Sequence, residues 1–108
     1  MKTLLDNFRK KLIRRHYESI IMLVQIFFGQ DRDEFGETIE EVIESYCFYN
    51  GDDGVCCLKN EITEMLKTED DTELEVRMVL LAENQFNPEP WGETWRSFLQ
   101  RVLRTLPV

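Results

Sequence analysis

The sequence predicts an all-α fold, a compact bundle of about five short amphipathic helices. Apolar residues recur at intervals of three and four in five segments, which is the spacing of one face of a helix. Short runs rich in glycine, proline, asparagine and acidic residues separate these segments and indicate tight connections. A chain of 108 residues can bury one core, so we expect residues 1–108 to form a single helical domain.

The first predicted helical segment ends near Phe28. Its apolar positions at helical spacing are Leu5, Phe8, Leu12, Ile13, Tyr17, Ile20, Ile21, Val24 and Phe28. The run Ile20–Phe28 is rich in β-branched and aromatic residues, so it is also compatible with a strand. Residues 1–28 can therefore form one helix, form two helices, or include a strand.

The second predicted helix begins at Thr38. Thr38 with Glu41 three residues later has the pattern of a capping box, and acidic residues in a first turn suit the helix dipole. The apolar stripe of this helix consists of Ile39, Val42, Ile43 and Tyr46. The glycines and aspartates of Tyr49–Gly54 accept turn conformations easily, so we expect this stretch to end the helix.

Three further helices complete the predicted bundle. Thr72 with Glu75 repeats the capping-box pattern and is expected to open the fourth helix. A proline-containing loop, Asn84–Glu93, precedes the fifth helix. The apolar stripes of the third, fourth and fifth helices are, in order, Val55, Leu58, Ile62, Met65 and Leu66; Leu74, Met78 and Leu81; and Trp95, Phe98, Leu99, Val102, Leu103 and Leu106.

Charge is distributed unevenly along the chain, whose net charge is −8. Residues 1–30 carry six basic and two acidic residues, residues 31–75 carry three basic and sixteen acidic, and residues 76–108 carry four basic and three acidic. The middle segment attracts basic surfaces and should accelerate encounter with a basic partner. The basic run Arg9–His16 could contact a polyanion, but the remaining negative charge opposes this, so we expect neither nucleic-acid nor membrane binding.

No motif predicts catalysis, a metal site or a cofactor. A calcium loop starting at Asp31 would need an oxygen ligand where Phe35 lies and a glutamate where Val42 lies. Without a C-x-x-C motif and with His16 as the only histidine, the chain lacks the ligands of a structural zinc site, and one histidine cannot supply the paired Glu-x-x-His motifs of a di-iron carboxylate bundle. The three cysteines form neither a disulfide framework nor a C-x-x-C motif, which favours a reducing compartment. We therefore expect a cytoplasmic protein that is not an enzyme.

The charge pattern favours a surface that binds a basic protein. Acidic residues between Asp31 and Asp53 surround three aromatic residues, Phe35, Tyr46 and Tyr49. In such an interface the aromatic side chains supply buried contact, and the carboxylates supply steering and selectivity.

Three stretches carry a family resemblance: FFGQDRDEFGETIEEVIESY, CLKNEITEMLKTEDDTELEVRMVL and NQFNPEPWGETWRSFLQRVLRTL. In order and residue type they resemble the contact-dependent growth-inhibition immunity proteins of bacteria, over residues 20–106. One departure is Gly29, which stands where one group of the family has a histidine. FFGQDRDEFG itself is expected to be a turn between helices, with the acidic residues after it beginning the partner surface.

The resemblance implies a small, mostly α-helical cytosolic protein without catalytic activity. Such proteins bind the C-terminal toxin domain delivered by a neighbouring cell and block its active site, and many of these toxins are nucleases with basic clefts. The chain is therefore expected to bind a basic cognate toxin, a nuclease, through Asp33, Glu34, Phe35, Glu37, Glu40, Glu41, Glu44, Tyr49, Asp52 and Asp53. The acidic turn Glu69–Glu73 is a second candidate surface. The alternative function is a non-enzymatic adaptor for a basic protein unrelated to toxins.

Overall fold

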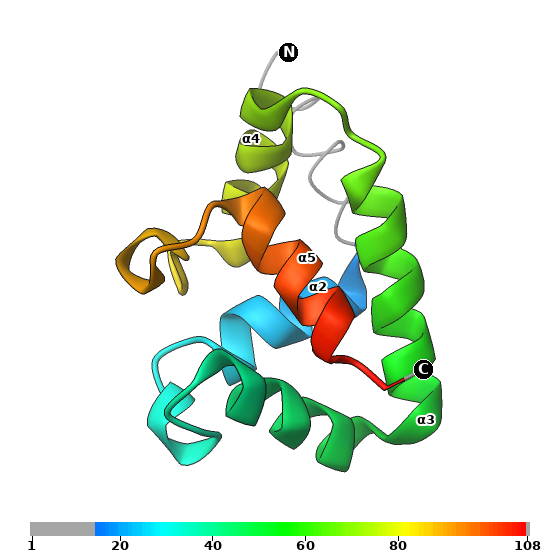
Figure 1. The fold of residues 1–108 in the computed structure, drawn as a ribbon, viewed down its shortest axis with the longest axis vertical. Coiled ribbons are helices and arrows are strands. Elements are labelled where there is room, and N and C mark those ends of the chain that lie inside the picture. Colours follow the sequence, from blue (N-terminus) through cyan, green and yellow to red (C-terminus); the bar gives the residue numbers. More distant parts are fainter. Residues whose placement is uncertain (1–14, 108) are drawn as a thin grey trace.

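The computed structural model describes residues 15–107, and every regular element among them is helical (Figure 1). In chain order these elements are α2 (Glu18–Met22), the π-helical turn η1 (Leu23–Phe27), the 3-10 turn η2 (Arg32–Glu34), α3 (Ile39–Leu66), α4 (Asp71–Ala82), the 3-10 turn η3 (Glu89–Trp91) and α5 (Trp95–Thr105). The all-α prediction is confirmed. No helix of residues 15–107 is long and apolar enough to cross a membrane.

The segment that was also compatible with a strand is helical, because α2 and η1 run without a break from Glu18 to Phe27. Its buried side chains include Ile20, Leu23 and Phe27, so the three-and-four spacing does mark the core-facing side. The expected helical positions Leu5, Phe8, Leu12 and Ile13 lie outside the described residues.

Neighbouring helices hold α2 and η1 by hydrogen bonds. The backbone N–H of Ile20 donates to the Glu61 carboxylate on α3 at 3.0 Å, and the Gln25 side-chain amide donates to the Leu81 carbonyl on α4 at 2.6 Å. The first bond satisfies an amide that has no partner within its own short helix. Both bonds therefore fix the position of this segment between α3 and α4.

The chain leaves η1 at Gly29, where only glycine fits. A Cβ built on Gly29 would lie 2.0 Å from the backbone oxygen of Gln25, so any side chain would force the backbone apart. This close approach accounts for glycine at a position where the family resemblance suggested histidine. The predicted turn follows directly, with η2 at its centre.

The main difference from the predicted bundle is α3, a single helix that bends at Gly51. The second and third expected helices are its two limbs, residues 39–50 and residues 52–66, and the expected loop Tyr49–Gly54 shrinks to one non-helical residue. Gly51 has φ 69° and ψ −173°, a conformation open almost only to glycine. Asp52 and Asp53 continue the helix instead of ending it, because acidic residues are favourable where a helix begins.

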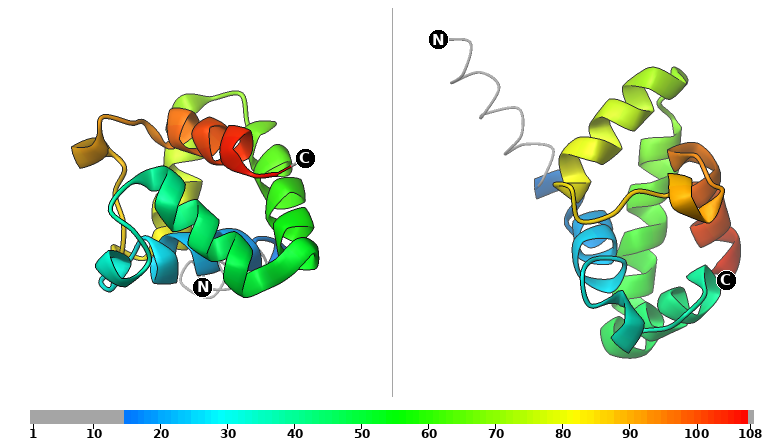
Figure 2. Two further views of the ribbon diagram at one scale, coloured as in Figure 1. Left: turned by 60° about the horizontal axis from the view of Figure 1, so that its bottom comes forward. Right: turned by 90° about the vertical axis from the view of Figure 1, so that its left-hand side faces the viewer.

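The two limbs of α3 enclose the core together with the other helices. The first limb runs along the bottom of Figure 1 and the second rises at its right, with α5 packed across both and α4 above. Turned by 90°, the same elements show α2 and α5 on opposite sides of the second limb (Figure 2). The side chains that are almost completely buried are Tyr46, Phe98, Ile20, Leu23, Ile39, Ile43, Leu58, Ile62, Met65, Leu74, Met78 and Leu81.

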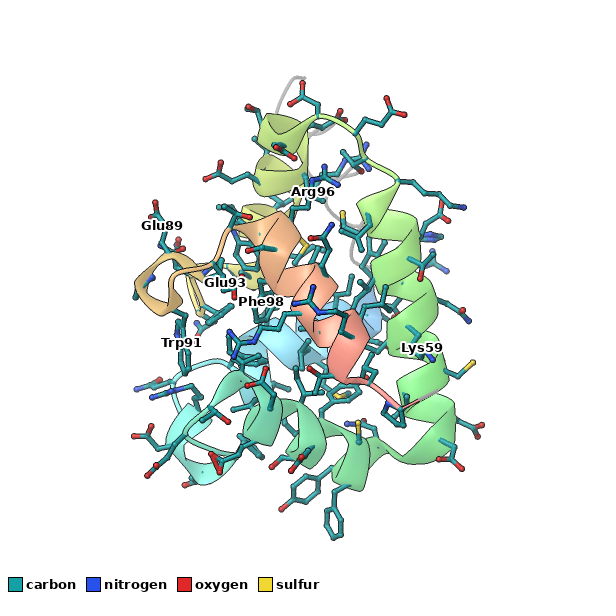
Figure 3. The ribbon with its side chains drawn as sticks, in the orientation of Figure 1. Lys59, Glu89, Trp91, Glu93, Arg96 and Phe98 are labelled. Carbon is teal, nitrogen blue, oxygen red and sulfur yellow. The ribbon has the colours of Figure 1, made fainter. Side chains whose placement is uncertain are left out.

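Two contacts bring the C-terminal helix into this core. The Phe98 ring on α5 packs edge-on against Phe28 with ring centroids 5.1 Å apart, and it points into the centre of the molecule (Figure 3). At the end of α5, the Lys59 ammonium donates to the Pro107 carbonyl at 3.0 Å. These contacts attach both ends of α5 to earlier parts of the chain.

Helix N-termini agree with the sequence in one case and differ in another. Thr38 caps α3 as predicted, since its hydroxyl accepts from the Glu41 backbone N–H at 3.1 Å. The predicted cap at Thr72 is wrong: α4 starts at Asp71, and the Asp70 carboxylate accepts from the N–H groups of Thr72 and Glu73. Aspartate is a strong N-cap, so Asp70 takes the role two residues earlier.

Replacing Gly51 by alanine is expected to lower the free energy of unfolding by about 1–3 kcal/mol, because the bend forces a backbone conformation that alanine strongly disfavours. A Cβ at this position would meet no atom within 4 Å, so the loss would report backbone strain and not a clash. Urea denaturation measures it. Thr63→Ala, on the exposed side of the second limb, is the control and should leave stability unchanged or slightly raised. Equal stability of Gly51→Ala and the wild type would contradict a glycine-dependent bend.

Candidate functional site

The acidic surface is the set of predicted contact residues on η2, on the turn after it and around the first limb of α3: Asp33, Glu34, Phe35, Glu37, Glu40, Glu41, Glu44, Tyr49, Asp52 and Asp53. Residues 31–53 contain nine acidic residues and one basic residue, Arg32. Because a turn of four residues connects η2 to α3, these residues belong to one continuous stretch of the chain, residues 33–53.

Most carboxylates of the acidic surface are exposed to solvent. Glu41 and Glu44 are three residues apart on the first limb, so their side chains point to the same side of the helix. Among the ion pairs of residues 15–107, none involves Glu34, Glu37 or Glu44. Asp52 and Asp53, just past the bend, are likewise exposed and outside these pairs. Within the described residues, these five carboxylates therefore carry negative charge that no ion pair compensates.

Glu40 differs from the other carboxylates because it holds two helices together. The Arg101 guanidinium on α5 donates to both of its oxygens, at 2.6 Å through Nε and at 2.8 Å through Nη2. The same guanidinium donates to Glu93 at 3.1 Å, and Glu93 also accepts from the Ser97 hydroxyl. The group formed by Glu40, Glu93, Ser97 and Arg101 connects α3, α5 and the loop before α5.

The pKa values of this group reflect its hydrogen bonds. Donation from Arg101 lowers the pKa of the Glu40 carboxyl, although desolvation acts in the opposite direction. The Ser97 hydroxyl is the main cause of the lowered pKa of Glu93, with Arg101 contributing further. Both carboxylates are therefore held in the charged form, and the charge of Glu40 is largely compensated inside the molecule.

The aromatic residues of the acidic surface lie in different environments. Phe35 is half-buried and packs against Phe27 with ring centroids 4.5 Å apart. Tyr49 remains 67% exposed. Tyr46, interpreted from the sequence as an edge of this surface, is instead buried, and its hydroxyl donates to the Gly54 carbonyl at 3.4 Å. Tyr46 is therefore a core residue, as its position on the apolar stripe of the helix indicates.

Phe48 is an exposed residue that sequence reasoning missed. It is 82% exposed, more than any other large hydrophobic side chain among the described residues, and its ring lies 5.3 Å from that of Tyr49. The signal was present in the sequence. Phe48 follows Tyr46 by two residues, which is about 200° around a helix, so it had to point away from the apolar stripe.

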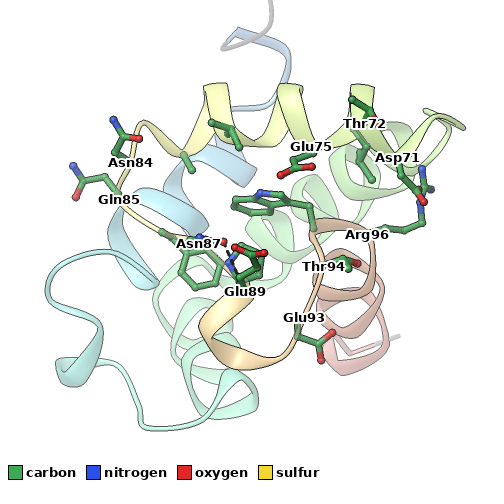
Figure 4. Close-up of a pocket in the computed structure, with 16 residues that line it drawn as sticks. Asp71, Thr72, Glu75, Asn84, Gln85, Asn87, Glu89, Glu93, Thr94 and Arg96 are labelled. Carbon is green, nitrogen blue, oxygen red and sulfur yellow. Dashed lines mark hydrogen bonds and ion pairs between the residues drawn. The ribbon is translucent and has the colours of Figure 1, made fainter.

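A second feature is a pocket of about 550 Å³ between α4, the loop after it and the start of α5. Figure 4 shows Asp71 and Arg96 together at one edge, with Asn84 and Gln85 at the other. Its remaining lining residues are Thr72, Leu74, Glu75, Val79, Ala82, Phe86, Asn87, Pro88, Glu89, Glu93, Thr94 and Trp95. The pocket thus combines apolar walls with several carboxylates.

Arg96, the basic residue that lines this pocket, already forms hydrogen bonds within the protein. Arg96 donates to the Asp71 carboxylate and to the Thr68 carbonyl, each at 2.5 Å, and so connects α5 to the turn between α3 and α4. The alternative contact region, Glu69–Glu73, lies at this edge of the pocket and shares Asp71 with it. It is separated from the acidic surface, which lies at the opposite end of the view in Figure 1.

The histidine, the cysteines and the acidic residues of the described part of the chain form no metal site. Residues 15–107 contain no group of three or more histidine, cysteine, aspartate or glutamate side chains that could hold a metal ion. Cys47, Cys56 and Cys57 are free thiols. His16 is exposed, with its ring edge-on to Tyr17 at 4.8 Å between centroids.

An all-α chain with many exposed carboxylates and two exposed aromatic rings, Phe48 and Tyr49, has the features of a protein that binds other proteins. A protein-family model described as CdiI immunity protein matches residues 16–106, and the chain belongs to this family. The resemblance to contact-dependent growth-inhibition immunity proteins is thereby confirmed. No curated protein and no solved structure matches the chain. Family membership implies an immunity protein that binds its cognate toxin.

Replacing Glu40 by glutamine is expected to lower the free energy of unfolding at neutral pH by about 1 kcal/mol or less, because both partners of the ion pair are at least one-third exposed and screened by solvent. The pKa of Glu40 is lower in the folded state, so its stabilising effect is present above the unfolded-state pKa and is lost as the pH falls through the folded-state pKa. Urea denaturation at a series of pH values should show the difference from the wild type disappearing in acid.

Glu44→Gln is the matched control for this experiment, because Glu44 lies on the same limb but is exposed and outside the ion pairs. Its stability should stay close to that of the wild type throughout the pH series. A loss at Glu44→Gln equal to that at Glu40→Gln would show that general charge, and not the pair with Arg101, is responsible.

Proposed function

We propose that this immunity protein neutralises a nuclease toxin domain by placing its acidic surface over the toxin's basic active site. The observation that carries the proposal is the set of exposed carboxylates, from η2 through the bend of α3, that are outside the ion pairs of the described residues. A nuclease must bind phosphates, so its cleft presents lysine and arginine side chains. Carboxylates of opposite sign complement such a cleft.

The arrangement suits rapid and selective binding. Concentrated charge steers a partner of opposite sign and raises the association rate, and it repels acidic surfaces and nucleic acid. The proposed protein is a non-enzymatic binder that acts in the cytoplasm as a single domain, without contact to nucleic acid or membranes. Three free thiols suit a reducing compartment. Family membership favours this function over an adaptor unrelated to toxins.

Within the acidic surface the residues are proposed to have different tasks. Glu37, Glu41 and Glu44 are exposed carboxylates on or next to the first turns of α3 and would contact basic residues of the toxin. Glu40 would mainly keep α5 and the first limb together, because Arg101 already binds it through two oxygens. The contact residues are thus carried by a helix that the Glu40–Arg101 pair attaches to α5.

Reversing the charge of Glu37, Glu41 and Glu44 to lysine is expected to weaken binding by at least about 100-fold, since three charge pairs of about 1 kcal/mol each would be lost and replaced by repulsion. The partner is the toxin domain encoded immediately upstream, and calorimetry at low and high salt measures the affinity. Wild-type binding should weaken as salt rises, and the variant should show less salt dependence. Circular dichroism checks that the variant is folded.

The matched control also replaces three exposed glutamates by lysine, namely Glu69, Glu75 and Glu89 near the pocket. Both triple variants have the same net charge. The control should therefore keep the wild-type affinity if binding depends on where the carboxylates lie and not on the total charge. If this control lost binding and the first variant did not, the contact surface would be the turn and pocket at α4. If the wild type showed no binding at micromolar concentrations, the proposed function would be wrong.

A toxin domain that cleaves RNA or DNA should lose that activity when an equimolar amount of this protein is added. The expected reason is occlusion of the basic active site, which also prevents nucleic acid from binding. An assay of cleavage together with nucleic-acid binding by the toxin separates the possibilities. Loss of cleavage with unchanged nucleic-acid binding would contradict occlusion and indicate contact away from the active site.

A further inference from the structure

Phe48 and Tyr49 form an exposed aromatic pair at the end of the first limb of α3. Their side chains are 82% and 67% exposed, and their rings meet edge to face with centroids 5.3 Å apart. Single exposed apolar residues are common, but two adjacent large rings leave an unusual amount of apolar area in water. Each such ring can bury about 150–250 Å² when covered.

Tyr49, the inner residue of the aromatic pair, contacts a line of rings that leads into the core. Tyr49 lies 6.1 Å from Phe35 and 6.2 Å from Phe27, and Phe27 in turn lies 5.2 Å from the buried Tyr46. The rings of Phe27 and Tyr46 are buried, so this line has a fixed base. Binding through rings already held in place loses little conformational entropy, which favours affinity.

Carboxylates border the aromatic pair on both sides along the chain. Glu44 precedes Phe48 by one helical turn, and Asp52 and Asp53 follow Tyr49 directly after the bend; all three are exposed. A second copy of this chain would bring like charges together around the rings, which opposes self-association. A partner that covers the pair must therefore offer an apolar surface rimmed by basic residues.

We infer that Phe48 and Tyr49 are the anchor of the toxin interface and enter an apolar depression that lysine and arginine side chains surround. This inference rests on the proposed function and deepens it. Rings buried at the centre of an interface supply most of the affinity, whereas charges around them mainly set the association rate and the choice of partner. Arginine side chains of the partner can also stack on the exposed ring faces.

The test compares Phe48→Ala and the Phe48→Ala/Tyr49→Ala double variant with the wild type, using the toxin domain encoded immediately upstream and calorimetry at about 50 mM and about 500 mM NaCl. Phe48→Ala should weaken binding about 30-fold and the double variant at least about 100-fold, with similar factors at both salt concentrations. A salt-independent loss separates this anchor from the steering carboxylates. Among the aromatic rings of residues 15–107, Phe48 contacts only that of Tyr49, so its single replacement should not affect folding.

The control is Val76→Ala/Val79→Ala on α4, where two side chains that are 63% and 48% exposed lose apolar area away from the bend. It should bind like the wild type. If the wild type binds but the aromatic double variant binds equally well, the anchor is wrong and the proposed function stands. If the wild type does not bind, the proposed function itself fails. Sedimentation of the protein alone adds a further check: a wild-type dimer that becomes a monomer in the double variant would overturn the inference.

Discussion

The bend of α3 at Gly51 is the constraint on which the rest of the structure depends. A straight helix of 28 residues would be about 42 Å long and could not surround a small core. With one residue at φ 69°, the helix becomes two limbs whose apolar stripes face the same interior. The stripe that ends with Tyr46 and the stripe that begins with Val55 thus share one core, and α5 packs against both. The end of the first limb, at the bend, lies at the surface of the molecule, where Phe48 and Tyr49 are exposed.

Electrostatics divides the acidic residues of the chain into two groups with different consequences. Two carboxylates that pair with an arginine, Glu40 with Arg101 and Asp71 with Arg96, connect segments far apart in sequence. Carboxylates outside the ion pairs of the described residues include Glu34, Glu37 and Glu44 near η2 and the first limb of α3, and Glu69, Glu75 and Glu89 near α4 and the loop after it. The first group stabilises the fold modestly because its members are partly exposed. The second group adds repulsion to the folded state, which binding of a basic partner would relieve.

Local patterns predicted much of this structure. The apolar stripes and the Thr38 cap depend on residues within one or two helical turns, and both could be read from spacing alone. The loop Tyr49–Gly54 was predicted too long, because two glycines and two aspartates suggest a turn, whereas aspartates also favour a helix start. The cap of α4 was predicted at Thr72 from the capping-box pattern with Glu75, whereas the helix begins after Asp70, whose residue type is equally favoured at an N-cap.

Long-range pairing could not be predicted in the same way. Glu40 and Arg101 are 61 residues apart, and nothing in their local sequence indicates that α5 crosses the first limb. The exposure of Phe48 was missed but could have been predicted from its angle relative to the apolar stripe. That prediction needed only a helix that continues to residue 50. The acidic surface was thus predicted as a set of residues, but the division into structural and free carboxylates needed the packing of α5.

Exposed aromatic rings are a liability for a protein at high concentration, because they favour association with other apolar surfaces. Here the carboxylates around Phe48 and Tyr49 offset that tendency, since two copies of the chain would have to bring Glu44, Asp52 and Asp53 close to their equivalents. The same carboxylates that repel a second copy of the chain would attract a basic partner. In the proposed interface, such a surface would keep apolar area accessible in the free protein and would favour its burial by a partner of opposite charge, which would make binding selective.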